Sequence, residues 1–85
     1  MSTLLPTAKV KTDSRAIAVE VDMDSLHVTL ADGRMVSAPL EWFPRLRDAS
    51  PAQQAKWRFI GPGIGIHWEE IDEDISVRSL LVAEM

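Results

Sequence analysis

The stretch Trp57–Ser76, WRFIGPGIGIHWEEIDEDIS, decides the fold that we predict for this chain. It holds two of the three tryptophans, three of the four glycines and the densest run of acidic residues. The pattern predicts a helix end, a glycine-rich turn, a short strand over 64–68 and an acidic lead-in to a last helix. Gly65 inside that strand indicates a bulge or a close approach of another backbone. Such a stretch is typical either of a site or of the place where a small fold closes on itself.

The residues before this stretch alternate between apolar and polar side chains, as half-buried strands do. Asp32-Gly33 separates two alternating runs and predicts a two-residue hairpin turn, because glycine tolerates the positive φ that such a turn needs. Residues 16–39 are therefore predicted to form an antiparallel β-meander of three strands with one apolar face. The side chains predicted on that face are Ile17, Val19, Val21, Leu26, Val28, Leu30, Val36 and Ala38.

Short helices are predicted to cover the apolar face of the meander. The first, over 39–46, is short and irregular because Pro44 interrupts it. The second, over 51–57, is predicted to begin after Ser50 as N-cap, and Gln53 stands at the spacing of a capping box.

The last helix is predicted over 76–84, with Asp74 or Ser76 as its N-cap. Together these elements predict an α+β fold: an antiparallel β-meander with one extra short strand, covered by short helices. We expect one domain over 13–85 and a flexible N-terminal arm over 1–12.

Composition narrows the classes of function. The chain of 85 residues has no cysteine, which excludes disulfides, thiolate metal sites and a cysteine nucleophile. Its net charge of −4 argues against direct binding of nucleic acid. No apolar run is long enough to cross a membrane, and the first ten residues lack the basic start of a signal peptide. We therefore expect a cytoplasmic protein with no membrane association.

The acidic residues of 69–74 are open to two interpretations. A run of charges is most often a solvated turn, and the sharper alternative is a contact for a basic partner. A milder basic region, 45–58, precedes the run. The acids are Glu69, Glu70, Asp72, Glu73 and Asp74.

No catalytic, metal or cofactor site is predicted. The glycines of 61–65 do not match a phosphate-binding motif, because Pro62 removes a backbone donor and a strand rather than a helix follows. His67 beside the acids offers too few good ligands for zinc, since His27 lies far away in the sequence. No serine or threonine is placed as a nucleophile beside a base.

The aromatic residues give the more useful clue about contacts. All three tryptophans lie between residues 42 and 68, and we expect them to be buried, with one in a protein interface as the alternative. The candidate contacts for a partner or ligand are Trp42, Arg45, Gly63, Gly65, His67, Trp68, Glu69, Glu70 and Glu73.

Four blocks of the sequence resemble the DUF2442 family, a domain of unknown function: ADGR (31–34), PLEWFPRL (39–46), WRFIGPGIGIHW (57–68) and DEDISVRSLL (72–81). The resemblance implies a compact α+β domain. It also implies either a regulatory input module, since some relatives carry a helix-turn-helix after this domain, or a stand-alone protein. The stand-alone relatives are often encoded beside another small protein, as in toxin–antitoxin pairs. The chain departs from the family pattern at Pro62 and Glu69.

Two hypotheses of function follow. The first is a non-enzymatic protein-interaction or regulatory module, the antitoxin-like half of a two-gene pair, whose partner is another small protein encoded nearby. The second is a small-ligand sensor or enzyme that uses the glycine-rich loop and His67.

Overall fold

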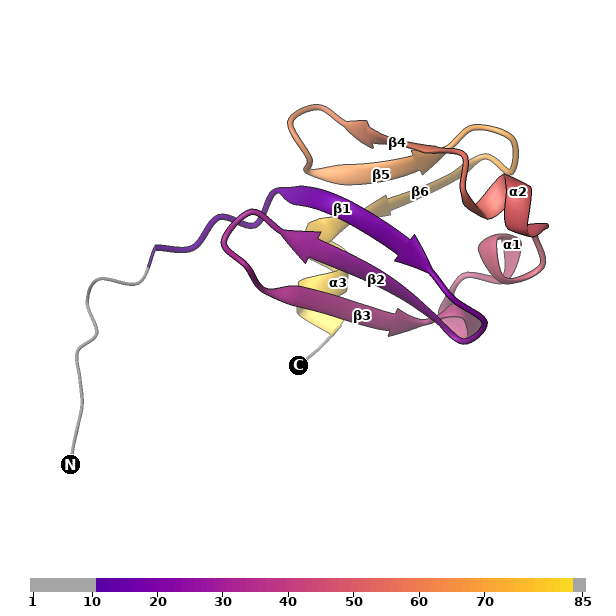
Figure 1. Ribbon diagram of the computed structural model, residues 1–85, viewed down its shortest axis with the longest axis horizontal. Helices are drawn as coiled ribbons and strands as arrows, with labels where there is room; N and C mark the ends of the chain where they lie inside the picture. The colour runs from indigo at the N-terminus through magenta and orange to yellow at the C-terminus, as the bar shows by residue number, and fades with distance from the viewer. Residues whose placement is uncertain (1–10, 84–85) are drawn as a thin grey trace.

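The computed structural model describes residues 11–83 as two antiparallel sheets linked by short helices (Figure 1). The first sheet has the order β1-β2-β3 and the second the order β4-β5-β6. The strands are β1 Ala16–Val21, β2 Ser25–Leu30, β3 Met35–Pro39, β4 Trp57–Ile60, β5 Gly65–Trp68 and β6 Glu73–Ser76. The helices are η2 Leu40–Trp42, α1 Pro44–Arg47, α2 Pro51–Gln54 and α3 Val77–Ala83. The predicted α+β class is confirmed, and most of the predicted arm, 1–12, lies outside the described residues.

The first sheet is the predicted meander, but the start of β1 turns a different side chain toward the core than predicted. In β2, Leu26, Val28 and Leu30 are fully buried, as predicted. Ile17 was predicted to face the core, but it is 56% exposed and Ala16 is buried instead. The pairing of β1 with β2 shifts between Ala16 and Ala18, which marks a β-bulge. The extra residue of a bulge reverses the alternation on one side of it, so the period-two pattern fails there.

The hairpin between β2 and β3 has a three-residue connection, and the predicted two-residue turn is wrong. The N–H of Leu30 donates to the carbonyl of Arg34 (2.8 Å), which leaves residues 31–33 as the loop. The N–H of Gly33 donates to the carbonyl of Leu30 (3.0 Å). Gly33 has φ +97°, so the predicted need for a positive φ is confirmed.

The second sheet contains the predicted strand and two that were not predicted. β5 corresponds to the strand expected over 64–68. β4 stands where the helix over 51–57 was expected to end, and β6 stands in the acidic lead-in. The side chains of Phe59, Ile66 and Ile75 lie in one row across the three strands. β4 and β6 adopt strand conformation because they pair with β5. A helix of two turns is too marginal to compete with this pairing.

Local helix signals predicted the helix starts. Ser50 Oγ accepts the N–H of Gln53 (3.1 Å) and Gln53 Oε1 accepts the N–H of Ser50 (3.0 Å), so the capping box is confirmed. Ser76 Oγ accepts the N–H of Ser79 at the start of α3 (3.0 Å). Asp74 lies in β6 and does not cap α3. The irregular helix over 39–46 is confirmed as η2 followed by α1.

One core lies between the two sheets and α3. α3 packs on β3 of the first sheet and on β5 and β6 of the second. The apolar face of the meander is therefore covered by α3 and the second sheet as well as by the shorter helices. The fully buried side chains of greatest volume are Trp68, Leu26, Leu30, Leu46, Ile66 and Val28.

Candidate functional site

The acidic turn, residues 69–74, is neutralised largely within the chain. Lys56 Nζ lies 2.9 Å from Glu70 Oε2, and Arg58 Nε lies 3.8 Å from Glu69 Oε1. The hydrogen bond from Lys56 lowers the pKa of Glu70. Of the basic region that the sequence placed at 45–58, Lys56 and Arg58 thus lie against the acidic turn, whereas Arg47 pairs with Glu41 and Asp48. Glu69 and Glu70 are therefore members of ion pairs within the chain rather than bare carboxylates.

Arg45 connects α1 to the same turn. Its Nη1 donates to the carbonyl of Asp72 (2.5 Å), and its Nε lies 4.0 Å from Glu73 Oε1. Asp72 has φ +53°, so its carbonyl is presented from a left-handed position in the turn. Three predicted contacts, Arg45, Glu73 and Glu69, therefore belong to one region, and Trp42 precedes Arg45 by three residues.

His67 is held on the outer side of the second sheet. It stands opposite Arg58 on one neighbouring strand and opposite Asp74 on the other. Its Nδ1 forms a hydrogen bond with Asp74 Oδ1, and its Nε2 lies 4.0 Å from Glu69 Oε1. Within residues 11–83, no group of three or more histidine and carboxylate side chains is placed to hold a metal ion. The arrangement is an imidazole–carboxylate pair that links two strands.

The glycine-rich loop is the place where the two sheets join. The N–H of Ala16 donates to the carbonyl of Gly63 (2.7 Å). A Cβ on Gly63 would lie 2.6 Å from the carbonyl oxygen of Ala16, and a Cβ on Gly65 would lie 3.1 Å from that of Ile75. The close backbone approach predicted at Gly65 is confirmed. The N–H groups of Gly63 and Ile64 both donate to the carbonyl of Ile60, so the turn itself uses these donors.

The three tryptophans have different environments. Trp68 is fully buried, and its Nε1–H donates to the carbonyl of Gln54 (3.0 Å), which ties α2 to β5. Trp57 is half-buried, and its ring centroid lies 5.0 Å from that of Phe59. Trp42 is 51% exposed. The expectation that all three are buried is wrong, and Trp42 matches the interface alternative in its exposure.

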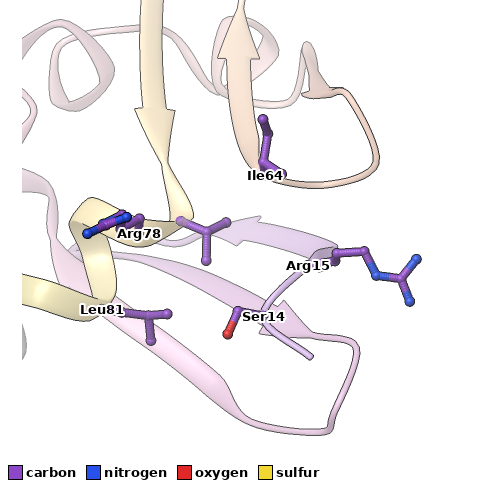
Figure 2. A pocket seen from close by; sticks show the side chains of 6 residues that line it. Ser14, Arg15, Ile64, Arg78 and Leu81 are labelled. Carbon is purple, nitrogen blue, oxygen red and sulfur yellow. The ribbon is translucent and has the colours of Figure 1, made fainter. Parts of the chain in front are cut away.

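Sequence reasoning missed an open cleft of about 430 Å³ between the approach to β1, the β4–β5 turn and α3 (Figure 2). Ile64, Val77 and Leu81 give it an apolar lining, and Ile64 is 59% exposed. Arg15 and Arg78 stand on opposite sides of it, on β1's approach and on α3. The spacing of Val77 and Leu81 places them on one helix face. Only the tertiary fold brings Ile64 to them.

Sequence reasoning also missed a polar network on the outer side of the first sheet. Asp22 Oδ2 lies 2.7 Å from His27 Nε2, and His27 Nδ1 lies 2.7 Å from Ser37 Oγ. Asp22 also accepts the N–H groups of Asp24 and Ser25. These bonds, above all that to His27, lower the pKa of Asp22 to about 2.

This aspartate–histidine–serine order also occurs in hydrolases, where the serine stands beside a substrate pocket and an oxyanion hole. None of these three residues lines the cleft beside α3 or the groove between β1 and α2. The network instead fastens the β1–β2 turn to β3. The partners lie on the β1–β2 turn and on two neighbouring strands, and they meet through the register of the sheet, which sequence reasoning did not follow.

The helices of residues 11–83 are all too short or too polar to span a membrane.

Comparison with known proteins identifies similar chains of unknown function. A family model described as "Protein of unknown function (DUF2442)" matches residues 16–85. A crystal structure of a protein of unknown function from Rhodospirillum rubrum is similar at 30% identity with a TM-score of 0.70. The similarity covers 81% of this chain and 86% of that chain. No curated protein matches.

Proposed function

Because the chain belongs to the DUF2442 family of proteins of unknown function, we propose a role for it from its surface. It is a non-enzymatic protein-interaction or regulatory module, the antitoxin-like half of a two-gene pair. Its partner is another small protein encoded nearby, and the pair works in the cytoplasm. The absence of cysteine from the sequence supports a reducing compartment.

The observation that carries the proposal is the exposure of Trp42. Half of this side chain faces solvent, in η2, and Arg45 follows it in α1 with its side chain 62% exposed. Tryptophan and arginine are the residue types that most often anchor protein interfaces. A tryptophan carries about 200 Å² of surface. Burial of the exposed half would therefore contribute about 2.5 kcal/mol at about 25 cal/mol per Å².

The surroundings of Trp42 support a protein partner over a purely apolar one. Arg45 leads from Trp42 to Glu73 and to the acidic turn, in which Glu69 has a side chain 79% exposed. An apolar anchor beside charged groups is the usual arrangement of a non-obligate interface, with a polar rim around a small core. The charges at the rim contribute to orientation and association rate more than to affinity.

The test is the affinity of the chain for the product of the neighbouring gene, by calorimetry. We expect Trp42→Ala to weaken the complex by about tenfold or more, as truncation of an anchor does. Met35→Ala is the matched control, because Met35 is 63% exposed but lies on β3. Equal affinities for the wild type and both variants would contradict the proposal, as would the absence of a complex.

The second function is a small-ligand sensor or enzyme that uses the glycine-rich loop and His67, and one observation favours the part that concerns the loop. Ile64 of that loop lines the cleft of about 430 Å³, which is within the size range of small-molecule pockets. A thermal-shift screen with metabolite-like compounds tests it, because a ligand stabilises the folded state by mass action. A stabilising compound whose effect is abolished by Leu81→Asp would favour this function.

A further inference from the structure

The hydrogen-bond pattern of the first sheet leaves part of β1 without a partner strand. The N–H of Leu30 donates to Arg34 and the N–H of Leu40 donates to Asp24, so the even-numbered residues of β2 bond β3. On the other side of β2, the N–H of Asp22 donates to the carbonyl of Ser25. The odd-numbered residues of β2 therefore form the backbone hydrogen bonds with β1. Hydrogen-bonded and non-hydrogen-bonded pairs alternate along an antiparallel ladder.

This alternation fixes which backbone groups of β1 point outward. Glu20 stands opposite His27 and bonds it, whereas Val19 and Val21 stand opposite Val28 and Leu26. The N–H and C=O groups of Val19 and Val21 therefore point away from β2. Among residues 11–83 they have no backbone partner. An exposed row of this kind is a template for another strand.

A groove lies along this part of β1. Its volume is about 270 Å³, and Val19 and Val21 form one wall while Gln54, Ala55 and Trp57 contribute to the other. At its start β1 is already bonded on this side, since the N–H of Ala16 donates to Gly63. β1 is the edge of the first sheet nearer to the second sheet (Figure 1). The residues of β1 that line the groove, 19–21, form its C-terminal half.

We propose that the β1 edge accepts an extended segment of a protein partner as an added strand beside residues 19–21. Strand addition of this kind takes its affinity from backbone hydrogen bonds and its specificity from alternate side chains. The inference goes beyond the proposed function, because it uses a surface separate from Trp42 and names the conformation of the partner segment.

The two sides of the groove define the chemistry of the segment. Residues that stand opposite Val19 and Val21 share their core-facing side and meet half-buried valines and Trp57, which favours apolar side chains. The residue opposite Glu20 shares its exposed side, and the chain carries a net charge of −4. A lysine or arginine is favoured there. The segment is therefore extended and alternates between apolar and basic residues.

The probe for the test is a blocked nine-residue peptide that alternates valine and lysine, titrated into the full chain and followed by amide chemical shifts and hydrogen exchange. We expect the largest shifts along 19–21 and at Trp57, and slower exchange of the Val19 and Val21 amides. In an antiparallel pair, the N–H groups of the valines opposite Val19 and Val21 face β1, so the same peptide N-methylated on its valines cannot donate these hydrogen bonds and should not bind. Absence of shifts at peptide concentrations up to about 1 mM, the weak end of specific binding, would overturn the proposal.

Proline substitutions locate the site. Val21→Pro removes an outward N–H and keeps the bonds to β2, because proline is tolerated at such edge positions. It should weaken peptide binding by about tenfold or more. Met35→Pro is the matched control, because Met35 stands in a non-hydrogen-bonded pair on the edge of β3. It should bind as the wild type does. Shifts along β3, or loss of binding in Met35→Pro alone, would overturn the proposal.

Two further measurements separate the outcomes. If Val21→Pro does not fold, Val19→Pro and the N-methylated peptide test the same bonds. Sedimentation of the free chain detects self-association; a dimer that Val21→Pro dissolves would show that a second copy occupies the edge and would overturn the proposal. Trp42→Ala should bind the peptide normally. Failure of the neighbouring gene's product to bind, with the peptide still bound along 19–21, would defeat the proposed function and leave this inference standing.

Discussion

Gly63 lies where the β4–β5 turn meets the start of β1, and it is buried there. Its φ of +105° is in the region that favours glycine, and a Cβ would lie 2.6 Å from a backbone oxygen of Ala16. Two separate constraints therefore act on one residue. Gly33 has a similar φ of +97° but nothing within 4 Å of its Cβ position, so only the first constraint acts on it.

This pair of glycines predicts a difference in stability. Gly33→Ala should cost about 1–2 kcal/mol, the price of a left-handed conformation for a residue with a side chain. Gly63→Ala should cost clearly more, because the backbone of β1 must also move. The measurement is the free energy of unfolding in urea for both variants. Equal losses would show that the contact with Ala16 relaxes freely and that the two sheets are not closely joined there.

Asp22 predicts a change of stability with pH. Its pKa is lowered from 3.8 to about 2 in the folded state, first by the hydrogen bond from His27. A lowered folded-state pKa stabilises the protein above about pH 4, and this contribution disappears as the pH falls toward 2. We expect Asp22→Asn to reduce Tm at pH 6, and its Tm should converge on that of the wild type near pH 2.

The control for this prediction is Asp24→Asn. The carboxylate of Asp24 accepts no hydrogen bond from residues 11–83, so this variant should follow the wild-type profile. Several other carboxylates also have lowered pKa values, among them Asp13, Asp32 and Glu70. The informative quantity is therefore the difference between each variant and the wild type. A constant difference from pH 6 to 2 would contradict the role of Asp22.

At the scale of elements, sequence patterns predicted what depends on near neighbours. The three strands of the meander and both sides of the capping box at Ser50 follow from local spacing, and all were confirmed. The facing of Ile17 was wrong because a bulge has no mark in the hydrophobic pattern. β4 and β6 were missed because they are determined by pairing with β5, which lies across a turn from each. Only the tertiary pairing distinguishes them from a helix end and a cap.

The capping box itself provides a prediction. α2 has four residues, and Ser50 and Gln53 satisfy each other's backbone N–H groups at its start. Ser50→Ala should therefore lower the free energy of unfolding by about 1 kcal/mol. Ser50→Asp retains an acceptor at the N-cap and should lose little. If chemical denaturation shows the same stability for Ser50→Ala as for the wild type, the hydrogen bond from Trp68 Nε1–H to the carbonyl of Gln54 holds α2 without its cap.

At the scale of the whole molecule, the candidate contacts predicted from sequence separate into two groups. Arg45, Glu73 and Glu69 come together in one region at the surface. Gly63, Gly65 and Trp68 are buried, and Gly63 lies where the two sheets join. The density of glycine, tryptophan and acidic residues distinguished the stretch Trp57–Ser76 from the rest of the chain. It did not distinguish a binding site from a closure of the fold, because both concentrate glycine and tryptophan. The two clefts escaped prediction because each is lined by segments far apart in the chain.

The last prediction concerns the electrostatic field of the whole molecule and its effect on association with a partner. Glu69→Gln, Glu70→Gln and Glu73→Gln together change the net charge from −4 to −1 (−4 + 3) and release Arg58, Lys56 and Arg45 from their ion pairs. If the acidic turn steers a basic partner, association with the neighbouring gene's product should slow and depend less on salt. Screening acts over about 8 Å at physiological ionic strength, so the location of the charges matters as well as their sum.

The matched control has the same net charge with the acids removed elsewhere: Asp24→Asn, Glu41→Gln and Asp48→Asn. Exposed ion pairs contribute about 0–1 kcal/mol each, so both triple variants should remain folded, with only small shifts of Tm. The measurement is a series of association rates from low to high salt for the wild type and both variants. A flatter salt dependence in the first variant alone places the steering charge at the acidic turn. If both variants show the same reduced salt dependence, net charge rather than the acidic turn accounts for the steering. If both keep the wild-type salt dependence, the acids of the turn do not steer association and have only a structural role.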